Sequence, residues 1–150
     1  MENYYELNEI KVSYKPTFNL TERPLVNSSA KIAKLLRDIW DDDTIQLFET
    51  FKVIFLNAQI KILGVMDIGL GGTDSTPVDV RRIFSTALLC NSVNIILSHN
   101  HPSGNLQPSN ADRLITSRII EAGELLNIKV LDHIIITDNG YLSFTDEGFM

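Results

Sequence analysis

The sequence predicts an α/β fold, an αβα sandwich in which helices flank a mixed β-sheet. Short runs rich in Val, Ile and Phe alternate with stretches in which apolar residues recur every three or four positions. Strands interleaved with helices in this way are typical of α/β proteins. A length of 150 residues and a hydrophobic content of 44% are sufficient for one domain with its own core.

The first 27 residues predict an N-terminal strand and connector, which we separate from a main domain of residues 28–150. Polar and apolar residues alternate over residues 9–14, as in a half-buried strand. Pro16 and Pro24 then interrupt any regular element. We therefore expect one short strand followed by a loop before the main domain begins.

The main domain begins with a predicted helix and a pair of strands. The helix is capped by Asn27 or Ser28 and runs to Trp40, because apolar residues recur at helical spacing between them. Residues 48–56 and 60–68 are rich in apolar side chains and are separated by a turn-like segment. They predict adjacent antiparallel strands.

The rest of the main domain predicts helices that alternate with strands. Residues 69–75 contain three glycines but lack the lysine and the spacing of a phosphate-binding loop, so we expect a connecting loop. The elements that follow are a helix at 80–88, a buried central strand at 95–97, a helix at 111–126 with Pro108 and Ser109 at its start, and strands at 128–137 and 141–144 around a tight turn at 138–140.

The composition excludes several kinds of partner and site. A formal net charge of −6 argues against direct binding to nucleic acid, because phosphate contacts need surplus Lys and Arg. Cys90 is the only cysteine, so we expect a small buried side chain rather than a disulfide or a cysteine-rich zinc site. The N-terminus does not resemble a signal peptide, and no apolar run approaches the roughly 20 residues that span a bilayer. We expect a cytoplasmic protein with no membrane partner.

Two of the three histidines lie two residues apart, directly after the predicted strand at 95–97. In extended backbone, His99 and His101 point to the same side while Asn100 faces away. A third ligand can come from Asp112, in the first turns of the next predicted helix. Two His, one Asp and an open position are typical of catalytic zinc, although the set also suits iron, cobalt or manganese. The sequence therefore predicts one divalent cation, zinc by preference, that activates water for hydrolysis.

Hydrolysis also needs a general base and a donor to the developing oxyanion. Glu49 is the candidate base, because it shares one face of its predicted strand with Phe51, Val53 and Phe55. The alternative is an exposed carboxylate at the strand start. Ser109 lies one helical turn before Asp112 and could donate to the oxyanion; the alternative is a helix cap alone. His133, in an apolar strand, is expected to be structural or to contact a metal ligand rather than to bind metal.

The spacing of these residues resembles a known motif. His99-x-His101, seven residues, Ser109, two residues and Asp112 is similar to the JAMM motif of JAB/MPN-type metalloproteases. The wider string His-Asn-His-Pro-Ser-Gly that begins at His99 resembles the RadC-like branch, and the resemblance extends from about residue 28 to the C-terminus. It implies a deaminase-like JAB/MPN fold, zinc bound by both His and Asp, a Glu base on an upstream strand, and hydrolysis of peptide or isopeptide bonds in a protein or peptide substrate.

The chain departs from the family pattern in two places. Longer RadC-like proteins have an N-terminal helix-hairpin-helix region, and the residues before Ser28 are too few to contain it, so we do not expect the family's DNA-repair association to apply. Arg82 stands where the family tends to have Glu. The main alternative function is a non-catalytic, metal-containing module that binds partners in DNA-processing machinery. A zinc deaminase is excluded because it would need a Cys-x-x-Cys pair, and a homodimer stays open.

Overall fold

A computed structural model describes residues 8–17, 19, 21–70 and 77–150. In this part of the chain a five-stranded sheet has the order β2-β1-β3-β4-β5, in which β3 and β4 are parallel and the other neighbours antiparallel. The elements are α1 (Ser29–Ile39), β1 (Thr50–Leu56), β2 (Ile62–Leu70), α2 (Val80–Leu89), β3 (Asn94–Asn100), α3 (Asn110–Leu126), β4 (Lys129–Ile136) and β5 (Tyr141–Ser143). The mixed sheet with flanking helices confirms the predicted fold class.

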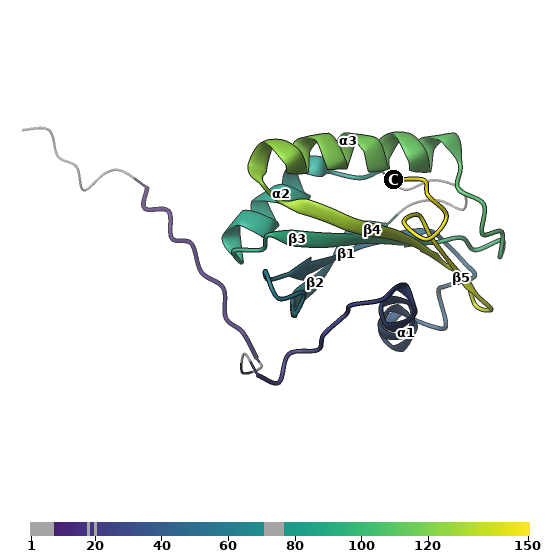
Figure 1. Cartoon of the computed structure of the whole chain (residues 1–150), viewed down its shortest axis with the longest axis horizontal. Helices are drawn as coiled ribbons and strands as arrows, with labels where there is room; N and C mark the ends of the chain where they lie inside the picture. The colour runs from purple at the N-terminus through teal and green to yellow at the C-terminus, as the bar shows by residue number, and fades with distance from the viewer. Residues whose placement is uncertain (1–7, 18, 20, 71–76) are drawn as a thin grey trace, which may run out of the picture.

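The helices cover the two faces of the sheet separately. Helices α2 and α3 lie on one face and α1 on the other (Figure 1). On the central strand β3, Ile95 and Leu97 belong to the core beneath α2 and α3, whereas Ile96 belongs to the core beneath α1. Because side chains alternate along a strand, His99 continues the α3 face and Asn100 the α1 face.

Hydrogen bonds from side chains define where the helices begin. The Ser28 hydroxyl accepts a hydrogen bond from the backbone N–H of Lys31 at 3.3 Å, so Ser28 rather than Asn27 caps α1. At the start of α3, Ser109 and Asp112 form a reciprocal capping box, in which each side chain accepts from the other residue's backbone N–H. The predicted cap by Ser109 is therefore confirmed.

Several expectations about element boundaries differ from the structure. Residues 9–14 form no strand, and Ile10 and Val12 are 89% and 72% exposed, because no strand among the described residues pairs with this segment to give the alternating pattern a core. The strand expected from residue 48 begins at Thr50. The loop expected at 69–75 lies mostly outside the described residues, and its first two residues belong to β2.

The composition-based expectations for the core and the surface agree with the described residues. Cys90 ends α2 as a buried member of the core beneath α2 and α3, as predicted. The three acidic residues at 41–43 are all exposed. Among the helices in the described ranges, none is both long enough and apolar enough to cross a membrane.

Gly123→Ala is expected to lower the free energy of unfolding by about 2–3 kcal/mol. A Cβ at Gly123 would lie 2.3 Å from the backbone oxygen of Ile128, and backbone cannot move aside as a flexible side chain can. The same Ile128 donates its N–H to the Gly123 carbonyl at 2.8 Å in the turn that ends α3. Urea unfolding measures the loss. Gly64→Ala is the matched control, since nothing lies within 4 Å of an added Cβ there, and equal midpoints for the two variants would contradict the prediction.

Candidate metal centre

The three predicted ligands come from the end of β3 and the start of α3. His99 lies inside β3 and is 1% exposed. His101 lies just beyond the strand, where its backbone N–H donates to the Ile136 carbonyl of β4 at 3.1 Å and so holds the chain extended. Asp112 lies in the first turn of α3, oriented by its capping box with Ser109. The strand end and the helix cap thus fix the positions of all three side chains.

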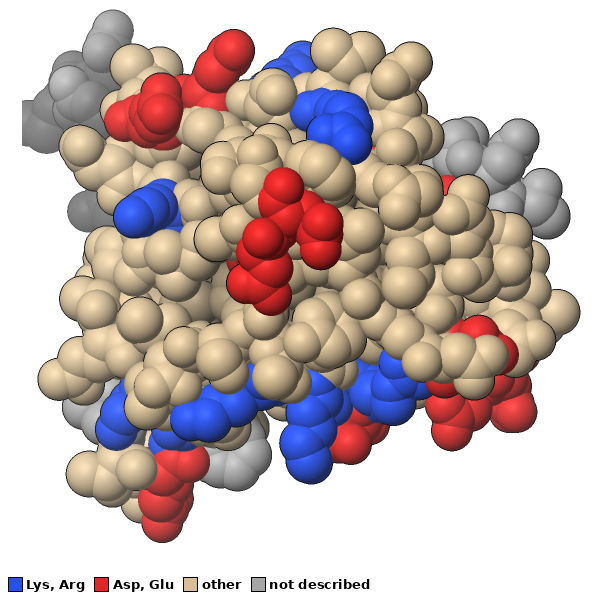
Figure 2. Space-filling view, turned by 45° about the vertical axis from the view of Figure 1, so that its right-hand side comes forward, with Lys and Arg blue, Asp and Glu red and all other residues tan. Residues whose placement is uncertain are grey.

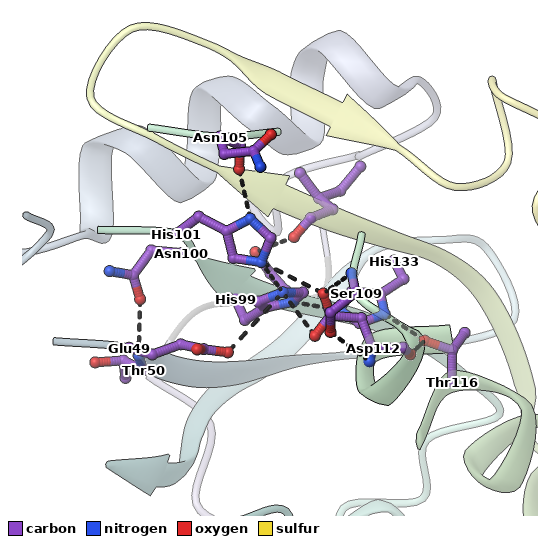
Figure 3. A network of polar contacts seen from close by, with 12 residues as sticks. Glu49, Thr50, His99, Asn100, His101, Asn105, Ser109, Asp112, Thr116 and His133 are labelled. Atoms are coloured by element: carbon purple, nitrogen blue, oxygen red, sulfur yellow. Dashed lines mark hydrogen bonds and ion pairs between the residues drawn. The ribbon is translucent and has the colours of Figure 1, made fainter. Parts of the chain in front are cut away.

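The three side chains converge on one point (Figure 3). His99 Nε2 lies 2.9 Å from His101 Nε2 and 3.3 Å from Asp112 Oδ1, and His101 Nε2 lies 3.4 Å from Asp112 Oδ2. Zinc bonds of about 2.0–2.2 Å place the corners of a tetrahedron roughly 3.3–3.6 Å apart. The two separations to Asp112 fall in this range but end on different carboxylate oxygens, and the two imidazole nitrogens lie somewhat closer together. With one ligand atom from each residue, all three atoms lie within 4.8 Å of one another, so His99, His101 and Asp112 could hold one small divalent cation.

Glu49 lies beside the same point although it precedes β1. Strands β1 and β3 are antiparallel with Phe51 opposite His99, and the same register continued by two residues places Glu49 next to His101. Glu49 is only 6% exposed, and its Oε1 lies 4.0 Å from His99 Nε2. The alternative of an exposed carboxylate is therefore wrong. The structure brings this carboxylate within reach of a water molecule next to a cation.

Asn100 holds the segment that carries Glu49. Its side chain is fully buried on the α1 face and donates from Nδ2 to the backbone oxygens of Ile45 and Phe48, at 2.7 and 2.9 Å. Its Oδ1 accepts from the backbone N–H of Thr50 at 2.7 Å. Sequence reasoning placed Asn100 away from the histidines but missed this role, because no local pattern links a strand residue to a loop about 50 positions earlier.

Ser109 lines a small cavity next to these residues. The cavity has a volume of about 250 Å³ and is lined by residues 101–103, Glu49, Asn105, Gln107, Ser109 and Asp112. The Ser109 hydroxyl oxygen accepts the capping hydrogen bond from Asp112 at 3.0 Å, which leaves its own proton available for donation. Capping is thus compatible with the oxyanion role, which stays a prediction.

His133 contacts Nδ1 of the His99 ring, whereas His101 and Asp112 lie against Nε2 of the same ring. His133 belongs to β4, is fully buried, and contacts His99 across the parallel pairing of β3 and β4. This placement agrees with the expectation that His133 contacts a ligand residue. Thr116, which contacts His133, was missed; its position one helical turn after Asp112 was the available signal.

The electrostatics of the site couple the imidazoles to the carboxylate. Burial lowers the pKa of His101, but hydrogen bonds to Asp112 and to the Asn105 carbonyl outweigh it and raise the pKa above the ordinary 6.5. Burial raises the pKa of Asp112, but the facing imidazoles of His101 and His99 hold it far below its usual range. Without a metal ion, these side chains therefore favour an anionic Asp112 and a proton on His101.

Zinc affinity is expected to fall as the pH is lowered from about 8 to about 6, by up to roughly tenfold per pH unit for each proton displaced. His101 must lose its proton to bind a cation. Because the pKa of His101 is raised above the ordinary 6.5, the pH below which protons compete with zinc for this side chain is raised as well. Below the pKa the proton competes with zinc, and above it the competition disappears. Competition with a chelator at several pH values measures the slope. An affinity that is constant over this range would contradict the prediction.

The fold and the site together define a protein of the JAB-domain class. The sequence model of the RadC-like JAB domain matches residues 26–149, and the chain belongs to this family. A UPF0758 protein of Flavobacterium johnsoniae is 49% identical over 100 residues, which cover 67% of this chain and 44% of that protein. A UPF0758 protein of Desulfitobacterium hafniense is 38% identical over 145 residues, 97% of this chain and 61% of that protein. The chain spans about half the length of these relatives.

Proposed function

We propose that this chain is a zinc-dependent hydrolase of peptide or isopeptide bonds in a protein or peptide substrate. The observation that carries the proposal is the approach of the Glu49 carboxylate to within 4.0 Å of His99 Nε2, beside the grouped His99, His101 and Asp112. A metal site that served only to stabilise the fold would be closed by a fourth ligand and would need no buried carboxylate beside it. The arrangement supports hydrolysis because the candidate base and two of the predicted ligands, His101 and Asp112, line the same cavity.

Each residue has a separate task in this reaction. His99, His101 and Asp112 would hold the cation, which when bound supplies a lowered pKa for water and polarises the scissile carbonyl. Glu49 takes the proton from the attacking water and returns it to the leaving amine. Ser109, which lines the cavity, donates a hydrogen bond from its hydroxyl to the oxygen on which negative charge develops.

Metal analysis and an amide-hydrolysis assay test the proposal together. Protein purified without chelator is expected to contain about one zinc per chain. Internally quenched peptides and lysine isopeptides are then incubated with the protein before and after removal of the metal. Cleavage that is lost with the metal and restored by added zinc would support the proposal. The absence of stoichiometric metal, or cleavage that survives its removal, would overturn it.

A non-catalytic binding module is the second candidate. The cavity of about 250 Å³ beside the site is small, since small-molecule sites usually span roughly 300–1,000 Å³. A module of this kind would bind metal and partner proteins without cleaving the quenched substrates. Metal without hydrolysis in the same assay would therefore favour it over the hydrolase.

Direct binding to nucleic acid is not part of either proposal. On the face shown in Figure 2, basic side chains gather along the lower edge with acidic side chains among them, and a separate acidic group lies near the centre. With a net charge of −6, the chain has no charge surplus to neutralise phosphates. We expect no binding to double-stranded DNA fragments at moderate salt in a mobility-shift titration. Binding that weakens steeply with added salt would contradict this expectation.

A further inference from the structure

A chain of hydrogen bonds links two of the predicted metal ligands through the interior of the fold. His99 Nδ1 lies 2.7 Å from His133 Nε2, and His133 Nδ1 lies 2.6 Å from Thr116 Oγ1. The Thr116 hydroxyl donates to the backbone carbonyl of Asp112 at 2.6 Å. The chain therefore begins at the backbone of Asp112 and ends on the ring of His99, opposite the nitrogen that faces the cation site (Figure 3).

Only one arrangement of protons satisfies this chain when both imidazoles are neutral. A carbonyl oxygen can only accept, so the single hydroxyl proton of Thr116 points to Asp112. Thr116 Oγ1 must then accept from His133, whose Nδ1 therefore carries a proton. His133 Nε2 is left as an acceptor, and His99 Nδ1 donates to it. The Nε2 atom of His99 consequently carries a bare lone pair.

The surroundings of His133 favour its neutral form. Its ring is fully buried, stacks on Phe144 at 4.6 Å between centroids, and meets the edge of Phe51 at 5.5 Å. A charge on this ring would therefore cost desolvation energy, so the protons stay in the arrangement set by the Asp112 carbonyl.

We propose that Thr116 and His133 are positioning residues that fix His99 in its Nδ1-protonated form and thereby aim its Nε2 lone pair at the cation site. The inference rests on the proposed metal site. Histidines that bind metal commonly donate their second N–H to a carboxylate or a carbonyl, and such partners raise metal affinity. Here the partner of His99 is another imidazole, which can either donate or accept. The direction of the hydrogen bond between the two rings therefore depends on Thr116.

The second histidine is fixed in the same form by a separate contact. His101 Nδ1 donates to the Asn105 carbonyl, so a neutral His101 also has its lone pair on Nε2. Two lone pairs and the Asp112 carboxylate then face one another at 2.9–3.4 Å. Such a group of acceptors is repulsive unless a proton or a metal cation lies among them. We call the chain of hydrogen bonds from Asp112 through Thr116 and His133 to His99 the relay. The relay thus prepares the site for a cation before one binds.

Thr116→Val tests the relay because valine keeps the shape of threonine but has no hydroxyl. His133 is then free to place its proton on Nε2, which would force the proton of His99 onto the nitrogen that faces the cation. We expect zinc to bind about 10- to 100-fold more weakly, measured by competition with a chelator of known affinity. Thr116→Ser keeps the hydroxyl and is expected to stay near the wild-type affinity.

Thr137→Val is the matched control. Thr137 is also a buried threonine whose hydroxyl donates to a backbone carbonyl, that of Gly140, but it lies outside the metal site. Its loss is expected to change zinc affinity little, even if it lowers the urea midpoint. Equal zinc affinities for Thr116→Val and wild type, or equal losses in Thr116→Val and Thr137→Val, would overturn the relay.

Nitrogen NMR of wild-type protein labelled with ¹⁵N-histidine gives a readout that needs no variant. After zinc is removed at a pH above the titration of His101, His99 and His133 are both expected to carry their proton on Nδ1. A proton on Nε2 of His133 would overturn the proposal, even if Thr116→Val fails to fold. Neither readout measures hydrolysis, so a chain with the expected protons and affinities but no peptidase activity would refute the proposed function and leave the relay intact.

Discussion

Glu49→Gln is expected to abolish amide hydrolysis, with a loss of about 10²- to 10⁴-fold, while zinc stays bound. Glutamine has nearly the same shape as glutamate but cannot take a proton from water at neutral pH. Because Glu49 lies 4.0 Å from His99 Nε2 without belonging to the group of three predicted ligands, the substitution separates base from ligand. Zinc content and the initial rate of peptide cleavage, measured on the same preparation, give both numbers.

Glu121→Gln provides the matched control for this prediction. Glu121 is an exposed residue of α3 outside the cavity, so the same chemical change is expected to alter neither zinc content nor rate. A Glu49→Gln protein that keeps the wild-type rate would show that another group acts as the base. A Glu49→Gln protein that loses its zinc would show that this carboxylate binds the metal directly.

The grouping of the three predicted ligands could be foreseen from sequence because local rules position these side chains. The strand rule for i and i+2 placed His99 and His101 on one side, and the capping pattern placed Asp112 at a helix start. Both rules act over a few residues and do not depend on the rest of the fold. Only the meeting of strand end and helix start required tertiary structure, and the distances of 2.9–3.4 Å confirm it.

The residues that surround the ligands depend on the order and register of the strands. Glu49 reaches the site because β1 lies next to β3 with Phe51 opposite His99. Thr116 and His133 meet because α3 packs over the face on which His133 continues the β4 alternation. The same dependence explains the error at residues 9–14, where alternation predicted a strand but no neighbouring strand completes it.

Alternation on the central strand gives the site its two kinds of support. His99 faces α3, where it contacts Asp112 and His133. Asn100 faces the α1 side, where its side chain holds the segment before β1. Consecutive residues of β3 thus position the metal ligand and, indirectly, the candidate base. A shift of one residue in the register of β3 would exchange these faces and separate Glu49 from the ligands.

Asp112→Asn is expected to weaken zinc binding by about 100- to 1,000-fold. Zinc binding of about 10–16 kcal/mol shared among four ligands amounts to roughly 2.5–4 kcal/mol for each, or about two to three powers of ten in affinity. Asparagine keeps an oxygen that can accept from the backbone N–H of Ser109, as Asp112 does at 2.7 Å, so the helix cap is preserved. What is lost is the negative charge that faces both imidazoles at 3.3 and 3.4 Å.

Asp79→Asn separates this loss of a ligand from the loss of a helix cap. Asp79 caps α2 by accepting hydrogen bonds from the backbone of Arg81 and Arg82, and it lies outside the metal site. The two variants therefore make the same chemical change at the starts of two helices, and only Asp112→Asn should reduce zinc affinity. Because the charge of Asp112 also raises the pKa of His101, the pH dependence of any remaining zinc binding should shift to lower pH in that variant. Undiminished zinc binding by Asp112→Asn would mean that the carboxylate only caps α3, and the hydrolase proposal would then lack its third ligand.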